Sequence, residues 1–127
     1  MQFSLAPWDY GEPCNVLCRR YTDLHLAFAP RILELARQTA QTGAPIIRPL
    51  WWLAPHDERA LTCDDQFLLG DDILAAPILT PGQRARDIYL PSGHWRDYWT
   101  GTEYRGEVLL RDFPAPLETL PLFLSCA

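Results

Sequence analysis

The chain has 127 residues, 48% hydrophobic and 21% charged, which is the composition of one globular domain rather than of a disordered segment. Its formal net charge is −5, and its 11 Lys/Arg positions are all arginines, scattered along the chain. This balance excludes the basic face that nucleic acid or an anionic membrane surface requires, so neither is expected as a partner.

Signals for targeting, membrane insertion and metal binding are absent from the printed sequence. No run reaches the roughly 20 apolar residues of a membrane span, and the opening MQFSLAPWDYGEP lacks the basic start and apolar core of a signal peptide. We expect a cytoplasmic location, although a longer parent protein would carry its own targeting segment. The cysteines show no CxxC pair or Cys/His ligand spacing, so we expect small buried thiols and no metal, cofactor or disulfide scaffold: Cys14, Cys18, Cys63 and Cys126.

The first predicted element is a helix from Pro13 to about Gln41. Proline suits the first helical turn, and Gly43 is placed to end the helix. Pro30 is expected to kink or divide it, because proline removes one helical hydrogen bond. Apolar side chains recur at helical spacing at Val16, Leu17, Leu24, Phe28, Ile32, Leu33, Leu35, Ala36 and Ala40.

The stretch PIIRPLWWLAP, residues 45–55, is a short apolar run bounded by prolines. Continuous apolarity is typical of a parallel strand covered on both faces. A helix, a short loop and a buried strand form an α/β unit, and one unit cannot close a sheet. We therefore expect that its neighbouring strands lie outside this chain.

The residue pattern changes from helical to strand-like near residues 66–72. The strand-like runs ILAAPIL, RDIYLP, VLLRDF and LPLFLS alternate with the turn signals TPGQ, PSGH, WTGTEYRG and PAPLET. This rhythm predicts an antiparallel β-sandwich. The expected organisation is an α/β part over residues 1–65 and a truncated β-sandwich over residues 66–127.

The segment CDDQFLLGDD holds four aspartates in two adjacent pairs, at positions 64, 65, 71 and 72. Paired carboxylates serve in glycosidases, in aspartic proteases and at metal sites. Adjacent residues of an extended chain point to opposite faces, however, so neither pair is expected to share a site. The alternating pattern of a calcium loop is absent, and turn aspartates commonly bond backbone N–H groups. We favour structural roles for all four.

Two further groups of residues are candidates for a binding site. His56 and Asp57 follow the predicted strand, and a site-facing position competes there with a solvated loop. Trp8 lies in a proline-rich loop with no periodic partner, where a site-lining position competes with a structural one. The side chains of the segment GHWRDYWTG, Trp95, Tyr98 and Trp99, are expected in the sandwich core and hairpin packing. No residue pattern indicates a nucleophile elbow or a catalytic triad.

In order along the chain, GAPIIRPLWWLAPHDE, DDQFLLGDDILAAPILTPGQRARDIYLPSGHWRDYWTG and APLETLPLFL resemble glycoside hydrolase family 31. The resemblance covers essentially the whole chain. It matches the end of that family's (β/α)8 barrel running into its proximal C-terminal β-sandwich. MQFSLAPW together with RPLWW and the following AP and DE resembles most the branch that contains the myogenesis-regulating glycosidase, a branch associated with α-galactosidase-type activity.

The resemblance implies a retaining α-glycosidase that hydrolyses O-glycosyl bonds of the α-galactosidase or α-glucosidase type through two aspartates. Both family motifs lie upstream of the segment that matches Met1. The resemblance therefore assigns no catalytic residue to this chain, and the isolated chain is expected to be inactive. It also implies two partners: a carbohydrate substrate and the missing N-terminal part of the same barrel.

Substrate-binding positions are implied on the last two barrel strands. MQFS falls on the seventh strand, where Gln2 and Ser4 take the places of an arginine and a histidine that touch the sugar in many α-glucosidase relatives. This departure is consistent with another sugar. PIIRPLWW matches the eighth strand, so Trp52, His56 and Asp57 are expected at its site-facing end.

One alternative from a different class stays open. A stand-alone, non-catalytic carbohydrate-binding β-sandwich would use the five tryptophans as an exposed platform for sugar rings. A remnant without function is a third possibility.

Overall fold

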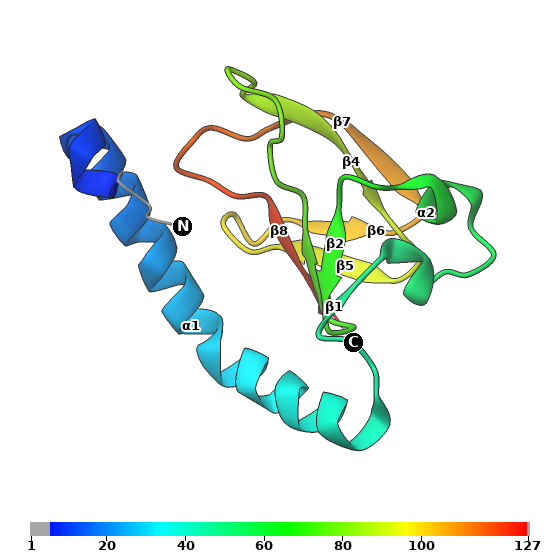
Figure 1. The fold of residues 1–127 in the computed structure, drawn as a ribbon. Coiled ribbons are helices and arrows are strands. Elements are labelled where there is room, and N and C mark those ends of the chain that lie inside the picture. The colour runs from blue at the N-terminus through cyan, green and yellow to red at the C-terminus, as the bar shows by residue number, and fades with distance from the viewer. Residues whose placement is uncertain (1–5, 127) are drawn as a thin grey trace.

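The computed structural model describes residues 6–126 as one long helix beside two antiparallel sheets (Figure 1). A 3-10 helix, η1 (Pro7–Tyr10), precedes α1 (Glu12–Thr42), which has 31 residues. Within this described range no helix has both the length and the apolarity needed to cross a membrane.

Helix α1 begins and ends close to where the sequence predicts. Pro13 lies in the first turn, and Gly43 adopts φ 74°, with its N–H donating to the Thr39 carbonyl at 2.8 Å. Pro30 lies inside the continuous helix, which changes direction about midway along its length (Figure 1). Proline therefore bends the helix without dividing it, because it removes one hydrogen bond while the neighbouring bonds persist.

The larger sheet has six strands in the order β1-β2-β3-β8-β5-β6. These strands are β1 (Ile47–Arg48), β2 (Phe67–Leu69), β3 (Ile73–Ala75), β5 (His94–Asp97), β6 (Glu103–Arg105) and β8 (Leu122–Cys126). The smaller sheet pairs β4 (Ala85–Leu90) with β7 (Val108–Pro114), and its register shifts between Arg86 and Ile88. All pairs are antiparallel, as predicted for residues 66–127.

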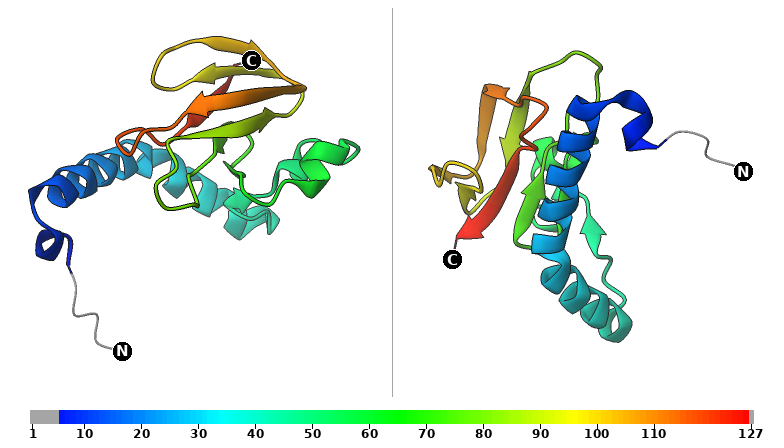
Figure 2. Two further views of the ribbon diagram at one scale, coloured as in Figure 1. Left: turned by 90° about the horizontal axis from the view of Figure 1, so that it is seen from above. Right: turned by 90° about the vertical axis from the view of Figure 1, so that its left-hand side faces the viewer.

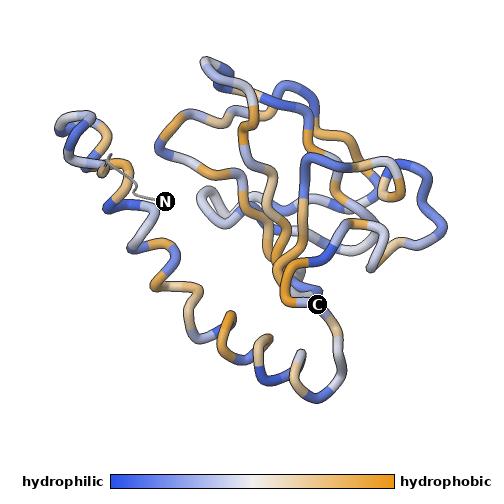
Figure 3. The backbone as a smooth tube through the Cα atoms, viewed as in Figure 1, coloured by the Kyte–Doolittle hydropathy of each residue, from blue (hydrophilic) through white to orange (hydrophobic). Residues whose placement is uncertain are grey.

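The six-stranded sheet separates two apolar clusters, because successive strand residues point to opposite faces. On β8, Phe123 faces the β4–β7 ribbon, whereas Leu122 and Leu124 face α1. The larger cluster contains Trp95 and Phe123, which are 2% and 0% exposed. Two further views show α1 lying across one face of the sheet (Figure 2). The most hydrophobic residues gather where β1, β2 and β8 meet (Figure 3).

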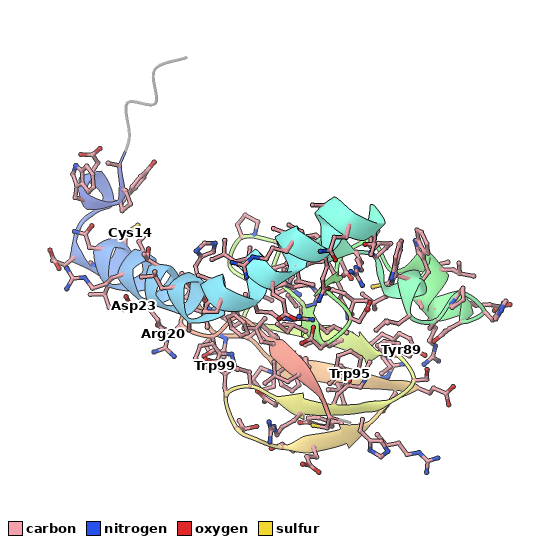
Figure 4. All side chains as sticks on the ribbon, turned by 90° about the horizontal axis from the view of Figure 1, so that it is seen from below. Cys14, Arg20, Asp23, Tyr89, Trp95 and Trp99 are labelled. Atoms are coloured by element: carbon pink, nitrogen blue, oxygen red, sulfur yellow. The ribbon has the colours of Figure 1, made fainter. Side chains whose placement is uncertain are left out.

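Helix α1 is anchored to the sheets by a few aromatic contacts. Phe28 lies 5.4 Å from Tyr98 between ring centroids, and the Arg20 guanidinium lies 5.1 Å from the Trp99 ring centroid (Figure 4). Tyr21 donates a hydrogen bond to the Leu117 carbonyl. Trp95 lies in the sandwich core as predicted, but Tyr98 and Trp99 pack at the helix instead.

Two expectations about local structure were wrong. The parallel strand expected over residues 45–55 is a two-residue strand, β1, which pairs antiparallel with β2 and leaves Ile47 60% exposed. Pro49, which has no N–H to donate, ends β1 before the 3-10 helix η2 (Leu50–Trp52). The predicted turn WTGTEYRG contains strand β6, which pairs with β5 through residues such as Tyr104, opposite Trp95. The predicted α/β and β parts thus share one sheet, and the assignment of residues 1–65 to a barrel stays a prediction.

Candidate functional site

A three-residue turn, Gly70–Asp72, joins β2 to β3 beside helix α1. Gly70 adopts φ 65° and its N–H donates to the Ile46 carbonyl at 2.8 Å. A Cβ atom at this position would lie 2.8 Å from Leu35 Cδ2, so only glycine fits the turn against the helix. The turn therefore brings its two aspartates close to α1 and β1.

Each aspartate of this turn pairs with a different arginine. Asp72 accepts from Arg31 Nη2 at 2.7 Å and from Arg31 Nε at 3.2 Å, which links the turn to α1. Arg31 also pairs with Glu34, and these carboxylates raise the pKa of Arg31, with the Asp72 hydrogen bond as the largest cause. Asp71 accepts from Nη1 of Arg48, a buried side chain on β1.

In the preceding aspartate pair, Asp64 and Asp65, the residue that forms an ion pair also has a structural role. Asp65 pairs with the buried Arg86 at 2.6 Å, and Arg86 also donates to the Asp65 carbonyl at 3.0 Å. Asp64 is exposed. The observed ion pairs confirm structural roles for Asp65, Asp71 and Asp72. Among residues 6–126, no group of three or more His, Cys, Asp or Glu side chains could hold a metal ion.

An open pocket of about 670 Å³ lies beside the short helix α2 (Glu58–Thr62). Its lining includes the predicted residues His56 and Asp57, together with Arg59, Tyr89 and Glu107. The predicted residues at positions 56 and 57 thus share one concavity. The lining mixes charged and apolar side chains, and Asp57 is already engaged within the protein.

Asp57 is the N-terminal cap of α2. Its Oδ1 accepts from the backbone N–H of Arg59 at 2.9 Å and of Ala60 at 3.3 Å, and its Oδ2 accepts from the Tyr89 hydroxyl. Burial of the phenol, followed by this hydrogen bond and the negative charge of Asp57, raises the pKa of Tyr89 to about 12. Tyr89 therefore keeps its proton and stays a donor at neutral pH.

The predicted tryptophans lie apart from that pocket. Trp52, on η2, is 39% exposed, and the Arg48 guanidinium carbon lies 5.2 Å from its ring centroid. Trp51 lies beside it, with ring centroids 6.3 Å apart. Trp8 is 71% exposed on η1, at the opposite end of α1 from β1 (Figure 1). Gln2 and Ser4 lie outside the described residues.

Arg48 organises this end of the molecule, although it was not among the predicted site residues. Arg48 interrupts the apolar run PIIRPLWW, yet it is 5% exposed. A charge within an otherwise apolar run indicates a buried partner, and this signal was available in the sequence. The partner, Asp71, is 23 residues away along the chain, so only the fold identifies it.

Comparisons with known proteins place these features in a family. Residues 43–126 match the family model described as the glycosyl hydrolase family 31 C-terminal domain. The chain is 45% identical over 124 residues to the myogenesis-regulating glycosidase of Mus musculus, covering 97% of this chain and 17% of that protein. It is 39% identical to α-glucosidase 2 of Bacillus thermoamyloliquefaciens over 119 residues, covering 94% of this chain and 15% of that protein.

A solved structure gives the same result for the fold. The crystal structure of a family 31 α-xylosidase from a soil metagenome, complexed with xylose, superposes with a TM-score of 0.91 at 34% identity. The superposition covers 100% of this chain and 19% of the α-xylosidase chain. The arrangement of helix, turn and sheets is thus that of the C-terminal region of a glycoside hydrolase. This chain belongs to glycoside hydrolase family 31 and spans less than a fifth of the length of these relatives.

Proposed function

We propose that this chain is the C-terminal part of a retaining α-glycosidase of the α-galactosidase or α-glucosidase type. Both catalytic aspartates would come from sequence that precedes the matched segment. The observation that carries this proposal is the family match over residues 43–126 combined with the small share of each relative that the chain spans. The reaction would be hydrolysis of an O-glycosyl bond in a carbohydrate substrate.

The aspartates of this chain already have partners within the protein, which supports a catalytic pair elsewhere. A retaining pair needs two carboxyl groups about 5–5.5 Å apart on either side of the scissile bond. Asp71 and Asp72 instead neutralise Arg48 and Arg31, and Asp57 caps α2. These carboxylates have structural partners, which fits a segment that supports the reaction rather than performs it.

The exposed surface of α1 supports the proposal that the remaining part of a barrel packs against this chain. Val16, Leu26 and Leu33 are 62%, 63% and 59% exposed. At 100° per residue they lie on the side of the helix away from Phe28 and Leu35. Strand β1 lies at the end of the six-stranded sheet. An apolar helix face and an open sheet edge are surfaces that further elements of a fold cover.

Substrate contacts are proposed for the residues at the β1–α2 end: Trp52, His56 and Asp57. For Asp57, only atoms not used in capping would be available to the sugar. Trp8 is proposed as a further contact because it is an exposed aromatic side chain in the proline-rich segment ahead of α1. Gln2 and Ser4, which lie outside the described range, are proposed on the basis of the family resemblance.

A graft tests the proposed function. This chain would replace the matching segment of the Bacillus α-glucosidase 2, and p-nitrophenyl α-glucoside and α-galactoside would be assayed. We expect the graft to hydrolyse the glucoside, whereas the 127-residue chain alone hydrolyses neither. Robust turnover by the chain alone, or a folded but inactive graft, would contradict the proposal.

The exposed tryptophans favour one second candidate, a non-catalytic carbohydrate-binding sandwich. Trp51 and Trp52 are 42% and 39% exposed and adjacent, as a sugar platform requires. Saturable quenching of tryptophan fluorescence by oligosaccharides, lost in Trp51→Ala and Trp52→Ala, would support this candidate. Unchanged fluorescence at millimolar sugar would eliminate it.

A further inference from the structure

Arg48 makes three different contacts with one guanidinium group. Its Nε donates to the Pro45 carbonyl at 2.8 Å, and its Nη1 donates to Asp71. The guanidinium carbon lies over the Trp52 ring, 5.2 Å from the ring centroid. Because the guanidinium is planar, its two hydrogen bonds restrict the orientation that it can take beside the indole.

The Trp52 ring depends on this contact for its position. The backbone N–H of Trp52 donates to the Pro49 carbonyl at 3.0 Å, which fixes the main chain but leaves the side-chain torsions free. The ring is partly exposed and contacts the Arg48 guanidinium and the Trp51 ring. An arginine held in place beneath it restricts the indole to one orientation.

Asp71 supplies the charge that keeps Arg48 in place. The Arg48 side chain is 6% exposed, whereas that of Asp71 is 58% exposed. A buried guanidinium that loses its carboxylate partner has an uncompensated charge and turns toward water. The link therefore runs from the turn after β2, through β1, to η2.

We propose that Asp71 is a positioning residue, which acts through Arg48 to fix the orientation of the Trp52 indole. What Trp52 then contacts rests on the proposed function, but the link from Asp71 to Trp52 does not. The neighbouring Asp72 provides a matched control, because it lies in the same turn and pairs with Arg31 of α1 instead.

Indole N–H resonances of the 127-residue chain test the link directly. Trp52→Phe identifies the Trp52 signal. Trp95 serves as an internal reference for folding, because its indole is buried and donates to the Pro91 carbonyl at 2.9 Å. We expect Asp71→Asn to shift or broaden the Trp52 signal with the Trp95 signal unchanged, Asp71→Glu to restore it, and Asp72→Asn to leave it in place.

A second variant keeps the test valid if Asp71→Asn unfolds the chain. Arg48→Lys keeps a positive charge near Asp71 but lacks the planar face and the Nε donor, so it should also displace the Trp52 signal while Trp95 stays in place. A Trp52 signal that is unmoved in the folded Asp71 and Arg48 variants would overturn the proposal. Equal shifts in Asp71→Asn and Asp72→Asn would overturn it as well.

The graft described above separates this inference from the proposed function. If Trp52 contacts the substrate, Asp71→Asn should raise KM about two- to fivefold, the size of an exposed cation–π contact, with a smaller change in kcat. In the Trp52→Phe background the same substitution should add nothing to KM. A shifted Trp52 signal with KM unchanged in both single variants would uphold the link and refute the proposed substrate contact of Trp52.

Discussion

The Tyr89 hydroxyl donates a hydrogen bond to the Asp57 carboxylate, so a strand of the smaller sheet holds the N-terminal cap of α2. Asp57 is therefore bound on one oxygen by two backbone N–H groups and on the other by a phenol. This arrangement allows the capping function of Asp57 to be tested separately from its proposed contact with substrate.

Asp57→Ala removes the cap and the acceptor for Tyr89, and we expect the free energy of unfolding to fall by about 1–3 kcal/mol. Asp57→Asn keeps a side-chain oxygen for the cap and should recover at least half of the loss. Urea denaturation followed by circular dichroism gives both values. An alanine variant as stable as the parent would show that the cap contributes nothing.

The raised pKa of Tyr89 predicts a loss of stability at high pH. An unfolded tyrosine ionises at about pH 10, whereas Tyr89 ionises at about 12 in the folded chain. The folded state therefore holds the proton more tightly, so the contribution is complete below pH 10 and is lost between pH 10 and 12.

Unfolding measured at pH 9, 10 and 11 should show a weaker pH dependence in Tyr89→Phe than in the parent. Tyr10→Phe is the control, because Tyr10 is 64% exposed. The same pH dependence in both variants would refute the attribution to Tyr89.

Gly70→Ala should destabilise the turn that carries Asp71 and Asp72. The residue has φ 65°, and a Cβ would meet Leu35 Cδ2 at 2.8 Å and Asp72 Oδ1 at 3.0 Å. We expect a loss of about 2–4 kcal/mol from backbone strain and displaced neighbours. Gly82→Ala, at φ 83° with no atom within 4 Å, should lose only about 1 kcal/mol. Equal losses in urea denaturation would show that the contact with α1 is unimportant.

The larger apolar cluster should dominate the stability of the sandwich. Phe123 is fully buried between Tyr104 and Phe113, with ring centroids 6.0 Å and 5.4 Å away. Phe123→Ala should lower the free energy of unfolding by about 3–5 kcal/mol. Ser125→Ala, two residues along the same strand and exposed, should change it by less than about 0.5 kcal/mol.

Phe28→Ala should loosen α1 without unfolding the sandwich. Phe28 packs against Tyr98 and the smaller cluster on the helix side of the sheet, whereas the sandwich core lies on the other side. Hydrogen exchange should become faster in the amides of α1 and stay slow in β5 and β8. Leu26→Ala, on the exposed side of the helix, should leave both unchanged. Faster exchange throughout would mean that helix and sheets unfold together.

The local elements of this protein follow from its sequence. Helix α1 ends at Gly43 because glycine readily adopts the left-handed conformation that closes the last turn. The apolar runs after residue 66 form antiparallel strands. The adjacent spacing of the aspartates also indicated structural roles, but the reason differs from the expected one: Asp71 and Asp72 lie in a turn, and each pairs with a different arginine.

The tertiary structure decided what the aspartates and the apolar run PIIRPLWW contact. Arg48 and Asp71 are 23 residues apart, and Asp57 and Tyr89 are 32 apart, so no local pattern could pair them. The expectation of a buried parallel strand failed because an apolar run specifies neither which of its residues are buried nor the direction of the neighbouring strand. Strand direction depends on which edge is available, and β2 provides that edge to β1.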